Sequence, residues 1–102
     1  MTSPEELVAA AHSSCFSMQL SDLIAAAGGT PHSLDVTADV SLGPDAGDGG
    51  FRLTGIALTV VGKVDGLDAA DFEKAAQDAK AGCPVSKALT GVDITLDASL
   101  SQ

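Results

Sequence analysis

Apolar residues near the start of the chain recur with the period of a helix. Ser3, Pro4 and Glu6 form a helix start, because the serine can cap, the proline suits the first turn and the glutamate completes a capping box. The Gly-Gly pair at 28–29 predicts the end of the helix near Ala27. Apolar positions cover most of its circumference, so we expect this helix to be central and buried on nearly all sides. They are Leu7, Val8, Ala11, Cys15, Phe16, Met18, Leu20, Leu23 and Ile24.

Two strands are predicted after this helix. Every second residue from Leu34 to Leu42 is apolar, which is typical of a strand with one buried face and one solvated face. Residues 43–50, GPDAGDGG, predict a hairpin loop. The segment from Phe51 to Val64 predicts a second, longer strand, in which Gly55 marks a candidate bulge.

The last third of the chain predicts two helices and a final strand. A helix from Asp68 to about Ala81 is followed by a short helix from Cys83 to about Leu89, and then by a strand from Val92 to Leu100. The order α-β-β-α-α-β predicts an α+β fold with a long buried central helix and an antiparallel sheet, most simply a meander.

These elements are too few to cover the first helix. Three strands and two short helices leave part of an apolar helix open to water, so either a second copy covers the rest or part of the domain lies outside this sequence. At 102 residues the chain is a single domain with a thin core and has no internal repeat or linker. We therefore expect at least a homodimer.

Charge and composition narrow the range of partners. Fourteen acidic and five basic residues give a formal charge of −9, which argues against binding to nucleic acid or to an anionic membrane surface. No apolar run approaches the about 18 residues that cross a bilayer, and the first residues carry acids where a signal peptide needs basic residues. We expect a cytoplasmic protein. Its two cysteines are then more often functional or free than a structural staple.

Cys83 lies where a helix is predicted to begin, with Pro84 at the first helical position. Free backbone N–H groups and the helix dipole stabilise a thiolate at such a position, so this cysteine is a candidate reactive thiol. In the alternative, Cys83 only caps the helix and packs against its neighbours.

Cys15 lies in the middle of the first helix on an apolar stripe, where a cysteine is more often a core residue. His12 lies three residues earlier on the same face and could act as a base, although a buried histidine with a partner, or a surface one, is the commoner case. A metal site made from His12, Cys15 and Cys83 would have too few ligands and no paired spacing, so none is expected.

Two motifs carry a family resemblance. The segment SPEELVAAAHSSCFSM (3–18) resembles the signature around the peroxide-reacting cysteine of the OsmC/Ohr family, and AGCPVSKALTGV (81–92) is similar to the signature around the partner cysteine. The stretch between them, residues 56–80, also fits. His12 and the Phe-Ser-Met that follows Cys15 favour the OsmC branch. The resemblance covers essentially the whole of residues 1–102 and implies the C-terminal part of an OsmC-like domain.

The resemblance implies a thiol-dependent peroxidase for organic hydroperoxides that needs no metal, haem or flavin. Cys15 would be the attacking thiolate and would become a sulfenic acid. Cys83 would condense with it to a disulfide, which an external thiol or dithiol reduces. Glu5 matches the acid that, in the family, helps to hold a catalytic arginine beside the thiolate.

The sequence departs from the family pattern before the first helix. Family members carry N-terminal strands there, which supply the activating arginine, and the chain's one arginine, Arg52, lies on the second predicted strand. Without a nearby cation, the thiol of Cys15 should be poorly ionised. A rival hypothesis is therefore a catalytically impaired remnant that dimerises or binds small apolar ligands.

Two further expectations concern distance. Glu5 and Cys15 are ten residues apart on one helix, so at a rise of about 1.5 Å per residue they lie about 15 Å apart. Glu5 of one chain would then have to approach Cys15 of another. In a third hypothesis, Cys15 and Cys83 are unrelated core cysteines that lie out of disulfide reach.

Overall fold

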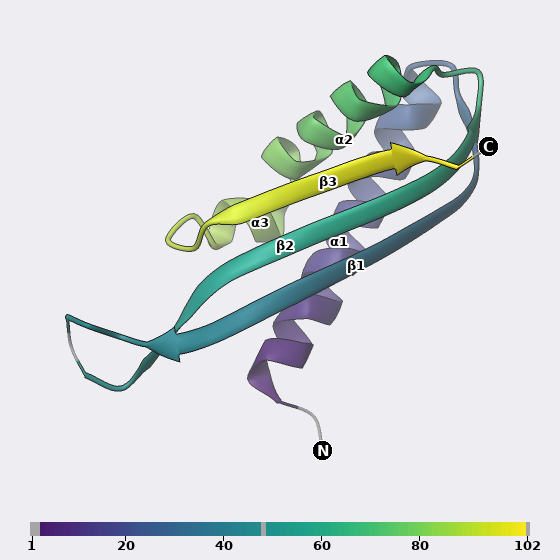
Figure 1. Ribbon diagram of the computed structural model, residues 1–102. Coiled ribbons are helices and arrows are strands. Elements are labelled where there is room, and N and C mark those ends of the chain that lie inside the picture. Colours follow the sequence, from purple (N-terminus) through teal and green to yellow (C-terminus); the bar gives the residue numbers. More distant parts are fainter. Residues whose placement is uncertain (1–2, 48, 102) are drawn as a thin grey trace.

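The computed structural model describes residues 3–47 and 49–101 and shows three helices on one side of a three-stranded sheet (Figure 1). The elements are α1 (Pro4–Ala26), β1 (Thr30–Pro44), β2 (Phe51–Asp65), α2 (Ala69–Gly82), α3 (Pro84–Ala88) and β3 (Ile94–Leu100). The predicted α+β class and the order α-β-β-α-α-β are confirmed. No helix in the described ranges combines the length and the apolar character needed to span a membrane.

Helix α1 begins as its sequence predicts. The Ser3 side chain accepts a hydrogen bond from the Glu6 backbone N–H at 3.2 Å, and the Glu6 carboxylate accepts one from the Ser3 N–H at 3.3 Å. This reciprocal pair is a capping box. The helix ends at Ala26, and Gly28 follows with φ +91°, a conformation that glycine adopts without strain.

Helix α1 is buried on one side only, which corrects the expectation of burial nearly all round. Its buried residues are His12, Phe16, Leu20 and Ile24. On other faces, Leu7 is 62% exposed and Met18 is 69% exposed. The sheet, α2 and α3 all contact α1, and Val8 and Leu23 are partly buried against the core, but Leu7 and Met18 remain largely exposed among the described residues.

The sheet has the strand order β1-β2-β3 and is not wholly antiparallel. Strands β1 and β2 form an antiparallel hairpin in which Val36 pairs with Val60, whereas β2 and β3 are parallel, with Leu58 beside Leu96. The expected antiparallel meander is therefore wrong at β3. Helices α2 and α3 carry the chain back along the sheet, so β3 runs in the direction of β2, as helical crossover connections require.

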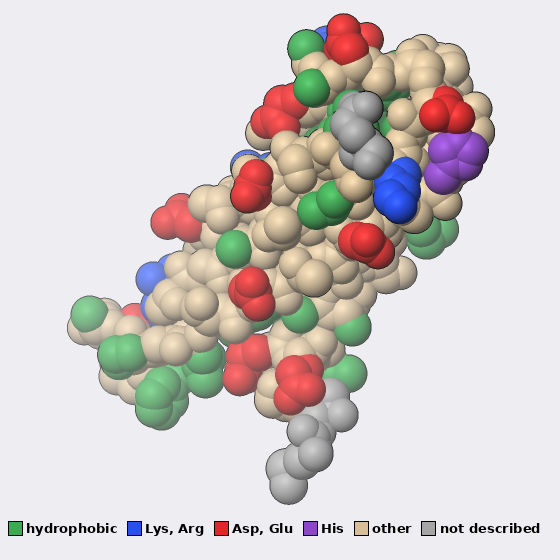
Figure 2. Space-filling view, turned by 45° about the vertical axis from the view of Figure 1, so that its right-hand side comes forward, with side chains coloured by type: hydrophobic (Ala, Val, Ile, Leu, Met, Phe, Trp, Pro, Cys, Tyr) green, Lys and Arg blue, Asp and Glu red, His purple; other side chains and the backbone are tan. Residues whose placement is uncertain are grey.

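The hairpin contains the irregularity that Gly55 suggested. Ser41 pairs with Gly55 and Leu42 pairs with Leu53, which leaves Thr54 as the extra residue of a bulge. Beyond the bulge the hairpin projects from the body of the molecule (Figure 1), and Figure 2 shows apolar side chains gathered at that end. Phe51, at the start of β2, is 76% exposed.

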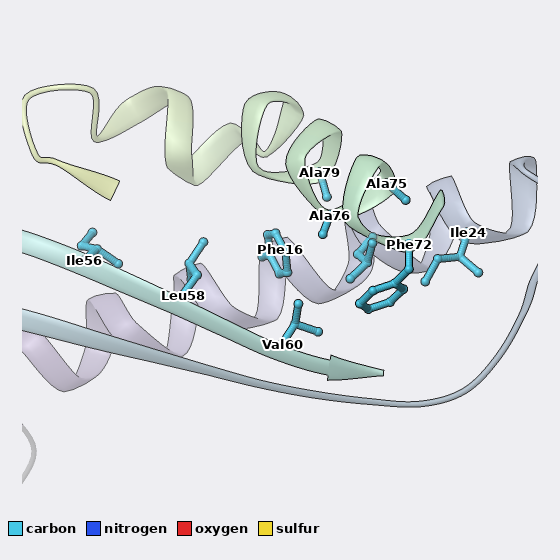
Figure 3. Close-up of a cluster of buried hydrophobic side chains, with 10 residues drawn as sticks. Phe16, Ile24, Ile56, Leu58, Val60, Phe72, Ala75, Ala76 and Ala79 are labelled. Atoms are coloured by element: carbon cyan, nitrogen blue, oxygen red, sulfur yellow. The ribbon is translucent and has the colours of Figure 1, made fainter. Parts of the chain in front are cut away.

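The core lies between the helices and the sheet, as Figure 3 shows. Three alanines on the buried face of α2, Ala75, Ala76 and Ala79, leave room for the large side chains around them. The ring of Phe72 lies over Gly62 of β2, where an added Cβ would be 2.7 Å from two ring carbons. This close approach fixes α2 on the sheet, and the end of α2 in turn positions Cys83. The ten members of the core cluster are Phe16, Leu20, Ile24, Ile56, Leu58, Val60, Phe72, Ala75, Ala76 and Ala79.

Candidate active site

Cys15 and Cys83, 68 residues apart in sequence, meet where α1 faces the junction of α2 and α3. Their Sγ atoms are 3.1 Å apart and both are free thiols. Cys15 is partly exposed, whereas Cys83 is fully buried. The predicted proximity of the two sulfurs is confirmed, and the hypothesis of two unrelated cysteines out of reach is wrong.

The local sequence explains the placement of Cys83. A proline disfavours helical geometry in the residue before it, and Cys83 accordingly has an extended backbone with ψ 122°. Its N–H still donates to the Ala79 carbonyl at 2.9 Å, and its carbonyl accepts from the Lys87 N–H at 3.0 Å. Cys83 therefore ends α2 and begins α3, as predicted, at a break in the helix that faces Cys15.

The surroundings of Cys83 favour its thiolate. Burial alone raises the pKa of Cys83, but hydrogen bonds outweigh burial and lower this pKa below its ordinary value. The donors are the Cys15 thiol, the backbone N–H groups of Ser86 and Val85, and the Ser86 hydroxyl. Either thiol can donate across the 3.1 Å contact, and once Cys83 is ionised the donor is Cys15.

The same contact has the opposite effect on Cys15. A hydrogen bond from the Val85 backbone N–H lowers the pKa of Cys15, but burial and the neighbouring Cys83 raise it by more, so that its pKa lies above the ordinary value. No cation of residues 3–47 or 49–101 contributes to either shift. Arg52, at the start of β2, instead donates to the Gly91 carbonyl at 3.4 Å.

His12 and Ser86 form a second side-chain contact between α1 and α3. Nε2 of His12 is 2.6 Å from the Ser86 hydroxyl oxygen, and the Ser86 hydroxyl is among the groups that lower the pKa of Cys83. His12 is fully buried, and burial lowers its pKa, so the ring is neutral. Within the described part of the chain, Nδ1 of His12 is buried and has no partner. Such an unpaired buried atom costs about 1–3 kcal/mol and calls for an explanation.

No role for Ser86 was predicted from the sequence. The signal that could have found it is spacing, because Ser86 follows Cys83 by three residues and His12 precedes Cys15 by three. Residues three apart share a helix face. When α1 and α3 face each other, the same spacing therefore allows His12 to meet Ser86 while Cys15 meets Cys83.

Glu5 does not join this group within one chain. It lies in the first turn of the continuous helix α1, ten residues before Cys15. No hydrogen bond or ion pair connects its carboxylate to another residue of the ranges that the structure describes. Because α1 is continuous over these ten residues, a rise of about 1.5 Å per residue keeps Glu5 about 15 Å from Cys15 of its own chain.

A cavity of about 390 Å³ lies next to Ser86 but contains neither cysteine. Its charged lining residues are Lys80, Lys87 and Asp93. Among residues 3–47 and 49–101, no three His, Cys, Asp or Glu side chains are grouped closely enough to hold a metal ion.

Comparison with known proteins places this geometry in a family. Residues 1–97 match the family model described as OsmC-like protein. The chain is 54% identical over 99 residues to peroxiredoxin OsmC of Escherichia coli (strain K12), a match that covers 97% of this chain and 67% of the relative. It is 39% identical over 97 residues to organic hydroperoxide resistance protein OhrA of Bacillus subtilis (strain 168), covering 94% of this chain and 66% of the relative. The chain thus spans about two thirds of the length of these curated relatives.

A solved structure shares this fold. The organic hydroperoxide resistance protein OhrB of Bacillus subtilis superposes with a TM-score of 0.84 at 33% identity, and the match covers 95% of this chain and 70% of that one. An organic hydroperoxide resistance protein from Elizabethkingia anophelis superposes with a TM-score of 0.85 at 30% identity, over 98% of this chain and 69% of that one. The parallel β3 and the two helices before it are part of the region compared.

Proposed function

Because the chain belongs to the OsmC-like protein family, we propose that it is a thiol-dependent peroxidase that reduces organic hydroperoxides through Cys15 and Cys83. The names of its relatives, peroxiredoxin OsmC and organic hydroperoxide resistance protein OhrA, support this class of activity. The observation that carries the proposal is the 3.1 Å separation of the two sulfurs, because a disulfide can form there with little movement of the backbone.

The proposed reaction has three steps. The Cys15 thiolate attacks a peroxide oxygen, the O–O bond breaks, and the alcohol leaves after taking up a proton, so that Cys15 becomes a sulfenic acid. The Cys83 thiolate then attacks the Cys15 sulfur; an S–S bond forms, the S–O bond breaks, and the hydroxyl group takes up a proton from solvent and leaves as water. An external thiol or dithiol reduces the disulfide and returns both cysteines to the starting state. These steps require no metal or organic cofactor.

The exposure of the two cysteines supports this division of roles. Cys83 ionises more readily, but it is fully buried, whereas Cys15 is partly exposed and can meet a hydroperoxide. The second step requires a thiolate within bonding reach of the Cys15 sulfur, and Cys83 lies in that position. The first step needs Cys15 itself to ionise, and a cation beside it would favour that.

We also propose that the protein works as a homodimer in the cytoplasm. The exposed apolar face of α1, which includes Leu7 and Met18, would be covered by a second copy. Glu5 of one copy would then act at Cys15 of the other, since the two residues are too far apart within one helix. A cytoplasmic location supplies reduced thiols for the last step.

The proposal is tested by adding a slight excess of cumene hydroperoxide to the reduced protein and counting free thiols. The wild type should lose both thiols. Cys83→Ser should accumulate a sulfenic acid at Cys15 that a dimedone adduct reports, and Cys15→Ser should keep its Cys83 thiol. The last variant is the control for nonspecific oxidation, because it retains the more acidic of the two cysteines.

Unchanged thiols in the wild type would contradict the proposal. They would favour a second candidate function, an OsmC-like module that dimerises or binds small apolar ligands. This second candidate is favoured by the raised pKa of Cys15, because a raised pKa disfavours the attacking thiolate in the single chain.

A further inference from the structure

We propose that His12 and Ser86 are positioning residues for Cys83: the Ser86 hydroxyl donates to the Cys83 sulfur, and His12 Nε2–H donates to the Ser86 oxygen and holds that hydroxyl in place. Neither residue takes part in the three steps of the proposed reaction. The consequence of this positioning for turnover rests on the proposed function, whereas its effect on Cys83 can be measured without any peroxide.

The two contacts form a matched pair between facing helices. His12 and Cys15 are three residues apart on α1, and Cys83 and Ser86 are three residues apart at the start of α3. His12 contacts Ser86 at 2.6 Å, and Cys15 contacts Cys83 at 3.1 Å. His12 and Cys83 are fully buried and Ser86 is 7% exposed, so water does not compete for these hydrogen bonds.

The direction of each hydrogen bond follows from the number of protons available. A serine hydroxyl has one proton, and if it is given to the Cys83 thiolate, the contact with His12 must use the Nε2 proton of the ring. The neutral ring then carries no proton on Nδ1, which is the atom without a partner among the described residues. A buried lone pair without a partner is tolerated more often than a buried N–H without one. The orphaned Nδ1 therefore fits this arrangement better than the reverse one.

The ionisation of Cys83 agrees with this reading. The Ser86 hydroxyl and backbone N–H both lower the pKa of Cys83 against the effect of burial. The other titratable group in contact with Cys83 is Cys15, from α1. On the outer side of Ser86, the charged residues are Lys80 of α2, Lys87 of α3 and Asp93, which line the adjoining cavity.

The consequence for the reaction is a readier second step. A hydrogen bond to a charged group changes a pKa by about one unit or more, so removal of the hydroxyl would lower the thiolate fraction of Cys83 about tenfold at a pH below its pKa. A more basic thiolate is also a better nucleophile, which recovers about half of that change on a logarithmic scale. Disulfide formation should therefore slow about threefold.

The test is a titration of Cys83 in a Cys15→Ala background, followed by the ultraviolet absorbance of the thiolate. Ser86→Val should raise the pKa of Cys83 by about one unit, and Ser86→Thr should leave it near the parent value, because valine and threonine share a shape and differ in the hydroxyl. Ser14→Ala is the matched control, since Ser14 is an exposed serine beside Cys15. It should not move the titration.

The effect of His12 on the pKa of Cys83 is tested with and without the Ser86 hydroxyl. His12→Leu should raise the pKa of Cys83 by less than Ser86→Val does, and should add nothing in the presence of Ser86→Val, because His12 acts through the hydroxyl. Circular dichroism confirms that each variant is folded. Equal titrations of the valine and threonine variants, or additive effects of His12→Leu and Ser86→Val, would overturn the inference. If the titrations behave as expected but hydroperoxide leaves the wild-type thiols intact, the proposed function fails and this inference stands.

Discussion

The proposed site consists of four side chains in two contacting pairs: His12 contacts Ser86, and Cys15 contacts Cys83. Sequence reasoning predicted the helix start at Cys83, because an extended residue before a proline is a local property of the chain. The contact with Cys15 and the part played by Ser86 could not be predicted from local patterns, since both depend on how α3 packs against α1. The family resemblance implied the contact between Cys15 and Cys83, but it implied no role for Ser86.

The two cysteines should titrate as a coupled pair. The pKa of Cys83 is lowered in part by the Cys15 thiol, and the pKa of Cys15 is raised in part by Cys83. Cys15→Ala should therefore raise the pKa of Cys83, and Cys83→Ala should lower the pKa of Cys15. Thiolate absorbance as a function of pH measures both changes. Independent titrations, with neither cysteine sensitive to loss of the other, would contradict the coupling.

His12 should contribute little to folding. Because Nδ1 is buried without a partner, replacing the ring with an apolar side chain removes one unsatisfied group. His12→Leu should leave the free energy of unfolding unchanged within about 1 kcal/mol, or raise it. Leu20→Ala, at a fully buried position of the same helix, should cost about 2–5 kcal/mol and shows that the measurement is sensitive. Urea unfolding followed by circular dichroism checks both variants, and a loss of several kcal/mol in His12→Leu would show a structural role.

At the scale of elements, the helices and strands followed from apolar periodicity, capping residues and glycines to within a few residues. The strand direction of β3 did not, because alternation in the sequence is the same for a parallel and an antiparallel neighbour. The predicted burial of α1 on nearly all sides was also wrong. Apolar positions show which side chains are more stable when buried, but they do not show whether residues of the same chain bury them. Leu7 and Met18 are apolar residues of α1 that remain exposed in the single chain.

The packing of α2 on β2 should be sensitive to one glycine. A Cβ at position 62 would lie 2.7 Å from the ring of Phe72, so Gly62→Ala should destabilise the fold by about 1–3 kcal/mol. Gly91→Ala is the matched control, because a Cβ there meets no atom within 4 Å. Thermal unfolding of the two variants compares them, and equal melting temperatures would show that α2 can shift at no cost.

At the scale of the whole molecule, the site is proposed to need two copies of the chain. Mixing Cys15→Ser chains with Glu5→Gln chains tests this by complementation. If Glu5 acts across the interface, each mixed dimer contains one intact pair of Cys15 and Glu5, so random mixing should restore about a quarter of wild-type peroxidase activity. If Glu5 acts within its own chain, or not at all, mixing should restore nothing beyond the sum of the two variants.

Peptide mapping without reductant, after one equivalent of an organic hydroperoxide has reacted, shows whether Cys15 and Cys83 form one redox pair. A single new cross-linked species should form that joins the peptides of Cys15 and Cys83 within one chain, and it should disappear on addition of a dithiol. Recovery of both peptides as free thiols, or of Cys15 linked only to another molecule, would contradict this pairing.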